Sequence, residues 1–238
     1  MTIIILVFLL AGLIKGVIGL GLPTIAMGLL SVVMPPSVAA SLLIIPSLVT
    51  NLWQLLIGPN FIRLFKRLWT MNAAIILGSL VSPLPSLNSG SSWTQAALGW
   101  VIVAYGLWGL AAKAAPNPSR HERWLSPIMG YITGAISAAT GLFVIPAVPY
   151  LQALQLNKND LVQALGLAFT ASTIGLALQL AKGDALAQLD YSQCVVALIA
   201  ALVGMFFGQH LRRHISEIAF RRCFFIGLIA LGVYMAWR

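Results

Sequence analysis

Lys15 is the residue of this chain best placed to do chemistry, because it is the only basic side chain deep inside an apolar stretch. A charge held at membrane depth costs about 2.5–3.5 kcal/mol on insertion scales, and such a residue is retained where it has a partner or a task. The acidic residues supply no partner, since all of them fall in expected loops or at the ends of expected spans: Glu122, Asp160, Asp184, Asp190 and Glu217. Two readings remain open. Either Lys15 faces an anionic substrate, or its amine is structural and caps carbonyl groups where the chain breaks.

Lys15 lies in one of two long apolar segments, residues 1–33 and 125–151, that are interrupted near the middle by glycines and hydroxyl residues. A helix that starts after such a break presents free N–H groups and the positive end of its dipole, which together attract anions. We therefore expect a small oxyanion to bind between the two breaks, although the glycines alone would also serve to make the turns. The candidate contacts are Gly19, Gly21 and Thr24 in the first segment and Thr140 and Gly141 in the second.

Further polar side chains occupy matching places on two later apolar segments. Their hydroxyl and amide groups either line a substrate pathway or bond neighbouring helices: Asn51 and Gln54 in the first half, Ser172 and Gln179 in the second. Enzyme motifs, metal-ligand clusters and a nucleotide-binding loop are not found in the sequence. We therefore expect neither an enzyme nor a primary pump, and no cofactor or metal.

The elements that must position these residues are membrane helices. Hydrophobic residues make up 60% of the chain and charged residues 8%, and the mean hydropathy is +0.95, which excludes a soluble globular domain. The formal charge of +9 does not indicate nucleic-acid binding, since the basic residues sit in short loops beside the spans. Besides the two broken segments, apolar stretches long enough to cross a bilayer run near 36–57, 68–83, 93–112, 161–181, 191–209 and 218–237.

The distribution of basic residues favours re-entrant hairpins at the two broken segments. If both segments crossed the membrane, the basic loops near 58–67 and 113–124 would lie opposite the basic loop near 210–222, against the positive-inside rule. If each enters and leaves by one face, nearly all basic residues share the cytoplasmic side: Arg63, Lys66, Arg67, Lys113, Arg120, Arg123, Lys158, Arg212, Arg213, Arg221 and Arg222. Only Lys182 and Arg238 then lie outside, with both termini. An arrangement of eight kinked spans is the alternative.

The chain also contains a weak internal repeat. A shift of 118 residues places Gly12 and Gly16 on Gly130 and Gly134, and a shift of 125 places Gln54 on Gln179. We expect two repeats, residues 1–118 and 119–238, each a broken hairpin plus three membrane helices. An odd number of crossings inverts one repeat relative to the other. The glycine pairs are typical of close helix packing, within one chain or in a homodimer.

The run Ala11-Gly-Leu-Ile-Lys-Gly-Val-Ile-Gly-Leu-Gly-Leu-Pro-Thr24, its degenerate echo at 130–146 and the two-half layout resemble the sulfite exporter TauE/SafE family. The resemblance covers essentially the whole chain, and Pro23 and Pro146 stand in the expected proline-containing runs. It implies a carrier that moves sulfite, sulfonates and other small organosulfur anions, usually outward. Two features depart from the family pattern: the second half has only Gly141 at its break, and Lys15 occupies a place that is often uncharged or acidic.

Together these observations predict an all-α, multi-pass protein of the bacterial inner membrane. We expect a secondary transporter or facilitator that exports a small anion, sulfite or a sulfonate, bound at the midplane between the broken helices. A membrane scaffold or lipid-handling protein is the alternative, and it would use Lys15 for folding alone.

Overall fold

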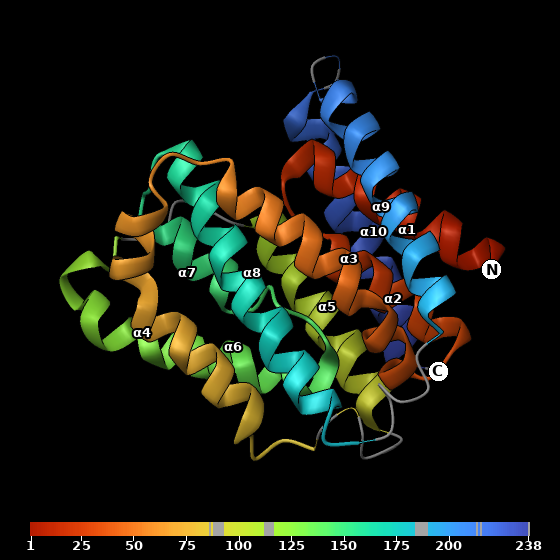
Figure 1. The fold of residues 1–238 in the computed structure, drawn as a ribbon, viewed down its shortest axis with the longest axis horizontal. Coiled ribbons are helices and arrows are strands. Elements are labelled where there is room, and N and C mark those ends of the chain that lie inside the picture. The colour runs from red at the N-terminus through yellow and green to blue at the C-terminus, as the bar shows by residue number, and fades with distance from the viewer. Residues whose placement is uncertain are drawn as a thin grey trace.

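The expected apolar runs form helices in the computed structural model, which describes residues 1–85, 87, 93–111, 117–183, 190–212, 214 and 216–237 (Figure 1). The helices are α1 (Thr2–Ile18), α2 (Leu22–Val33), α3 (Pro36–Leu56), α4 (Phe61–Leu80), α5 (Trp93–Ala111), the 3-10 turn η2 (Ser119–His121), α6 (Glu122–Thr140), α7 (Ala147–Ala153), α8 (Lys158–Leu180), α9 (Tyr191–Leu211) and α10 (Glu217–Ala236). No strand occurs in the described ranges. Lys113, Asp184, Arg213 and Arg238 lie outside them.

The six expected unbroken spans correspond to α3, α4, α5, α8, α9 and α10. Within the described residues, four segments are long and apolar enough to cross a membrane by length and composition: Pro36–Leu56, Lys158–Leu180, Tyr191–Leu211 and Ala219–Ala236. The loop boundaries expected at the basic residues were wrong. Arg63, Lys66 and Arg67 lie in the first turns of α4 and not in a loop, and Arg123, Arg221 and Arg222 likewise lie in the first turns of α6 and α10. Their long side chains carry charge into water from the exposed end of a helix, so the polar stretch does not interrupt the backbone.

Both broken segments are interrupted as the glycines indicate, but the two breaks differ in length. α1 ends at Gly19 (φ 76°), and Gly21 (φ 103°) precedes α2. These left-handed conformations favour glycine because it has no Cβ. α6 ends at Gly141 (φ 72°), but the next helix begins only at Ala147. The expectation that a helix starts directly after Thr140 and Gly141 was therefore wrong.

Helices pair across the two halves of the chain. α1 packs along α9 and α4 along α6, while α3 packs on α8 and α5 on α10. Where α1 meets α9, a Cβ at Gly12 would lie 2.2 Å from the Ala201 carbonyl oxygen, and one at Gly16 would lie 2.3 Å from that of Met205. The small residues thus let two helix backbones approach closely, and their expected packing role is confirmed within this chain.

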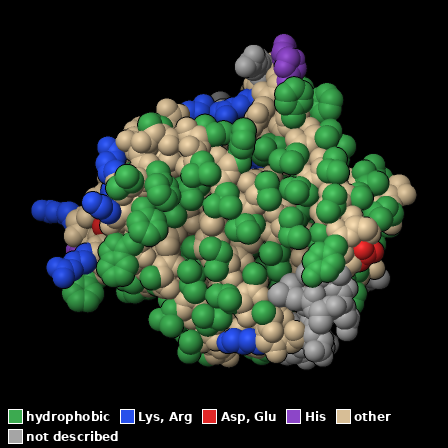
Figure 2. Space-filling model, viewed as in Figure 1, with side chains coloured by type: hydrophobic (Ala, Val, Ile, Leu, Met, Phe, Trp, Pro, Cys, Tyr) green, Lys and Arg blue, Asp and Glu red, His purple; other side chains and the backbone are tan. Residues whose placement is uncertain are grey.

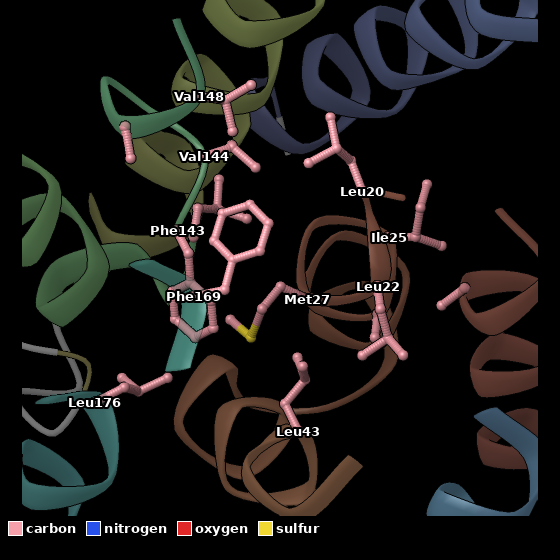
Figure 3. Packing of buried hydrophobic residues seen from close by; sticks show 14 of the residues in the cluster. Leu20, Leu22, Ile25, Met27, Leu43, Phe143, Val144, Val148, Phe169 and Leu176 are labelled. Carbon is pink, nitrogen blue, oxygen red and sulfur yellow. The ribbon is translucent and has the colours of Figure 1, made fainter. Parts of the chain in front are cut away.

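Apolar side chains fill the interior between α2 and the second break (Figure 3). Met27 of α2 points toward the rings of Phe143, in the non-helical stretch, and Phe169 in this view. The rings of Phe143 and Phe169 have centroids 6.5 Å apart. This part of the molecule is a packed apolar core.

The ends of the molecule differ in charge. Figure 1 places both termini at its right-hand edge. In the same view, Lys and Arg side chains gather mainly along the upper-left edge, and a smaller group lies at the lower edge (Figure 2). Hydrophobic side chains cover most of the surface between them, as expected of a surface that faces lipid.

Candidate functional site

A cavity of about 430 Å³ opens beside the first break and reaches Lys15. The end of α1 and the Gly19 turn form one wall, and Thr50, Trp53 and Gln54 of α3 form another. Residues of α8, α9 and α10 complete it. The cavity therefore lies between elements of both halves, as substrate sites of transporters commonly do.

Lys15 is buried, with 4% of its surface exposed. Its Nζ donates to Thr50 Oγ1 at 3.0 Å and to Asn51 Oδ1. Both acceptors are neutral, and neither ion pair among the described residues involves Lys15. A protonated lysine has three donors, so two acceptors leave the third N–H of Lys15 for a ligand in the cavity.

The sequence of α3 explains how the acceptors are held. Pro46 lies within the helix, and Thr50 Oγ1 donates to the Pro46 carbonyl at 2.7 Å. This bond fixes the hydroxyl with its lone pairs toward Lys15. Asn51 Nδ2 lies 3.4 Å from Thr173 Oγ1 on α8, so the amide connects the lysine of the first half to a helix of the second.

Gln54 joins the first break to α8. Its Nε2 donates to the carbonyl oxygens of Gly19 at 3.3 Å and Val162 at 3.0 Å. A carbonyl exposed by the end of a helix is thereby satisfied by a side chain. Gln54 holds the Gly19 turn at the wall of the cavity.

The structure brings four of the predicted site residues together: Lys15, Gly19, Asn51 and Gln54. Asn51 belongs to this group through its bond to Lys15 Nζ and does not itself line the cavity. The other six do not line the cavity either: Gly21, Thr24, Thr140, Gly141, Ser172 and Gln179. Thr140 Oγ1 donates to the Ile136 carbonyl at 2.7 Å in its own helix. A Cβ on Gly141 would meet the side chain of Met27. The two breaks are thus separated by apolar side chains. For all ten residues, a role in binding stays a prediction.

Three cations at the cavity were read in the sequence only as markers of topology: Lys158, Arg212 and Arg221. They come from the start of α8, the end of α9 and the first turns of α10. The signal that would have identified them is their position at the ends of three helices, but only tertiary packing shows that these ends meet. No acidic side chain lines the described cavity.

Asp160, two residues after Lys158, is bonded to groups outside the cavity lining. Asp160 accepts from Arg63, from Asn60 Nδ2 at 2.8 Å and from Asn157 Nδ2 at 2.8 Å. These bonds tie the turn between α3 and α4 to the start of α8. Four basic side chains thus line the cavity, and a positive lining attracts anions.

Comparison with known proteins agrees with a cavity suited to an anion. A family model described as sulfite exporter TauE/SafE matches residues 4–235, nearly the whole chain. No curated protein and no solved structure matches the chain significantly.

Proposed function

Because the chain belongs to the sulfite exporter TauE/SafE family, a family of membrane transporters, we propose that it exports a small sulfur oxyanion that binds at Lys15. The resemblance read from the sequence is confirmed, and the protein is a transporter and not an enzyme. Sulfite or a sulfonate is the substrate class that we propose.

One observation carries the proposal. Lys15 is a buried cation with two neutral acceptors, no described carboxylate partner and a cavity beside it. A buried charge without a counter-ion is costly, and an oxyanion at Nζ would relieve that cost through a charge-assisted hydrogen bond. A purely structural lysine would gain nothing from the cavity.

The energetics suit outward movement. An interior-negative potential favours the exit of an anion by about 2.3 kcal/mol per charge per 100 mV. Among the described residues, the acidic side chains of Glu122 and Asp160 are held by Arg67 and Arg63, and Asp190 caps the start of α9. No carboxylate there is placed to relay protons through the cavity. We therefore infer a uniport or an anion-coupled mechanism.

The same packing supports two inverted repeats, residues 1–118 and 119–238, with re-entrant hairpins and both termini outside. Gly12 of α1 abuts the carbonyl of Ala201, and its repeat mate Gly130 abuts that of Met71. Each hairpin therefore packs on the other half's helix at an equivalent position. Both chain ends lie at one edge (Figure 1), away from the main group of basic side chains (Figure 2).

We propose that buried hydroxyl groups line the onward path beyond Lys15. Thr24, Ser47, Ser137 and Ser172 have side-chain oxygens with no hydrogen-bond partner among the described residues. Leaving such a group unsatisfied costs about 1–3 kcal/mol. We infer that the anion or water contacts these groups when the protein opens to the other face.

The test is flux of sulfite, sulfate, thiosulfate, a sulfonate and a small carboxylate from proteoliposomes, with thermal stability measured against the same anions. Lys15→Met should abolish both flux and anion-dependent stabilisation while the protein still folds, because it removes a buried charge. Lys182→Met is the matched control, since Lys182 is an exposed lysine that bonds the Leu80 carbonyl at 3.0 Å. If Lys15→Met folds and keeps normal flux, or if it fails to fold with or without anions, the site is wrong and the scaffold function gains support.

A further inference from the structure

Gln54 presents a hydrogen-bond acceptor to the cavity. Its Nε2 donates to the carbonyl oxygens of Gly19 at 3.3 Å and Val162 at 3.0 Å. A glutamine amide has two N–H donors and one carbonyl acceptor. Because both partners are carbonyl oxygens, which only accept, the two N–H groups must face them, and Oε1 is turned away from both.

This oxygen is left for a ligand. Among the described residues none donates a hydrogen bond to Gln54 Oε1, although Gln54 is only 9% exposed. Oε1 is not one of the fully enclosed oxygens without a partner, and Gln54 lines the cavity. A small ligand in the cavity therefore reaches Oε1, and it must bring a hydrogen-bond donor to bond this oxygen.

Gln54 lies one helical turn from an acceptor of Lys15. Thr50 and Gln54 are four residues apart on α3, so they share a face of the helix, with their Cβ atoms about 5–6 Å apart. Thr50 Oγ1 accepts from Lys15 Nζ at 3.0 Å, and all three residues line the cavity. One small oxyanion can thus accept from Nζ and donate to Oε1 at the same time.

The end of α1 adds further acceptors to the same wall. The last carbonyl groups of a helix have no helical partner, and no backbone N–H of the described residues donates to the carbonyl oxygens of Gly16 or Ile18. Both residues line the cavity. Since this is the negative end of the helix dipole, a second negative charge on the ligand is disfavoured here.

The other basic side chains that line the cavity are less enclosed than Lys15. Lys158 is exposed, and Arg212 and Arg221 are half-buried, so water and salt screen their interaction with a ligand. Lys15 is buried and supplies one positive charge when protonated. The buried part of the site is therefore matched to one negative charge and one hydrogen-bond donor.

We propose that Gln54 is a specificity-determining residue, and that the transported ion is a singly charged sulfur oxyanion with its own donor, as hydrogen sulfite is. The O–H of the ion donates to Gln54 Oε1 while another of its oxygens accepts from Lys15 Nζ. This inference rests on the proposed function. Sulfate and the sulfite dianion lack the donor, so either would place a negative oxygen against Oε1, and sites built to bond a ligand O–H discriminate strongly against such ions.

Sulfamate and methanesulfonate test the donor alone. Both are monoanions of nearly the same shape throughout the neutral pH range, but sulfamate carries N–H donors where methanesulfonate carries a methyl group. We expect calorimetric titration of the full-length protein to give binding of sulfamate that is tighter by about 10-fold or more. Sulfate, a dianion without a donor, should also bind more weakly than sulfamate.

Gln54→Met removes the acceptor, and Gln163→Met is its matched control. Gln163 is also a buried amide between α3 and α8, since its Nε2 donates to the carbonyl oxygens of Leu55 and Gly58, each at 2.7 Å. Its Oε1, however, accepts from the Asn60 N–H at 3.1 Å, and Gln163 does not line the cavity. Both variants lose the same kind of anchoring, but only Gln54→Met should bring the sulfamate and methanesulfonate affinities within about 2-fold of each other.

The wild-type protein gives a second test that needs no variant. Sulfite takes up a proton as the pH falls through the neutral range, whereas sulfamate does not. The ratio of sulfite affinity to sulfamate affinity should therefore rise toward acid pH, because hydrogen sulfite is the bound form. Taking the ratio cancels the titration of side chains in the described lining, where the titratable ones are all basic: Lys15, Lys158, Arg212 and Arg221.

Several results would overturn this inference and leave anion binding at Lys15 in place. They are equal binding of sulfamate and methanesulfonate by wild type, a preference that survives in Gln54→Met or is lost equally in Gln163→Met, tighter binding of sulfate than of sulfamate, and a sulfite-to-sulfamate ratio that does not rise toward acid pH. If Gln54→Met does not fold, the wild-type ratios decide. If wild type binds none of these anions, or if Lys15→Met binds them equally well, the proposed function itself fails.

Discussion

In the first broken segment, the residue three places after Gly12 is Lys15, which bonds two side chains of α3 and reaches the cavity. In the second, the residue three places after Gly130 is Thr133, which is buried and donates to the carbonyl of Met129 in its own helix at 2.7 Å. The helices around them nevertheless pack alike. The repeat that we propose would thus preserve a backbone arrangement and place the lysine in one half only.

The partners of these two residues differ in the same way. Thr50 and Asn51 accept from Lys15, whereas a shift of 125 places Gly175 and Leu176 at the matching positions of α8. The matching positions of the second half therefore offer no side-chain acceptor for an amine. Close packing needs small residues in both halves, but the anion site that we propose needs its cation and acceptors in one half only.

Placing a lysine in the second broken segment should have the largest effect on stability. Thr133→Lys would bury an ammonium group without acceptors or a cavity, and we expect the free energy of unfolding to fall by about 3–5 kcal/mol. Thr133→Met controls for side-chain length without charge and should cost less, about 1–3 kcal/mol. Denaturant unfolding of the purified proteins measures both. Equal losses for the two variants would mean that size and not charge distinguishes the segments.

Alanine at Gly16 or at its repeat mate Gly134 should lower the stability of the protein by the same amount. A Cβ at Gly16 would lie 2.3 Å from the Met205 carbonyl oxygen, and one at Gly134 would lie 2.0 Å from that of Ile75. We expect each substitution to lower the free energy of unfolding by about 3 kcal/mol, because neither helix backbone can yield. Gly227→Ala is the control, since no atom lies within 4 Å of its added Cβ. A large loss in one half alone would contradict equivalent packing.

A carboxylate beside Lys15 should neutralise its charge and leave both broken segments without net charge at this depth, while the lysine itself stays in place. Asn51→Asp would pair with the ammonium group, and we expect sulfite affinity to fall about 10- to 100-fold, the equivalent of one charge-assisted hydrogen bond. Thermal stability without anion should be unchanged or higher. Thr173→Val, which removes the group facing the Asn51 amide without adding charge, should change affinity less than about 3-fold. Unchanged affinity in Asn51→Asp would show that the anion does not sense Lys15.

The smallest effect on flux and stability is expected from removing the Thr133 hydroxyl in the second broken segment. Thr133→Val keeps the side-chain shape and loses one bond within α6. Sulfite flux should stay within about 2-fold of wild type, and stability should change by about 1 kcal/mol or less. A flux loss as large as that of Lys15→Met would give the second segment a direct part in binding.

Much of the fold could be predicted from the sequence, because the length of an apolar run indicates whether it forms a helix that can cross a membrane. The stretches expected near 191–209 and 218–237 are helices of nearly those lengths. The start of α4 was missed, since a search for apolar runs does not detect a helix whose first turns carry Arg63, Lys66 and Arg67. The late start of α7 was missed because Phe143 and Val144 are apolar whether helical or extended.

The site was predictable only in part. The insertion cost of an isolated charge identified Lys15, and the glycines identified the break beside it. Its bond to Thr50 joins residues 35 positions apart, which no local pattern encodes. The meeting of the starts of α8 and α10 with the end of α9 likewise depends on helix packing. Local sequence thus indicates the charge, and tertiary structure supplies its surroundings.

The most direct measurement is a structure of the protein bound to selenite, a heavier analogue of sulfite whose anomalous scattering locates the ion. Our account predicts a peak beside Lys15, with an oxygen about 2.7–2.9 Å from Nζ, the usual length of a charge-assisted bond. A well-ordered anion elsewhere, with Lys15 still bonded only to Thr50 and Asn51, would contradict it.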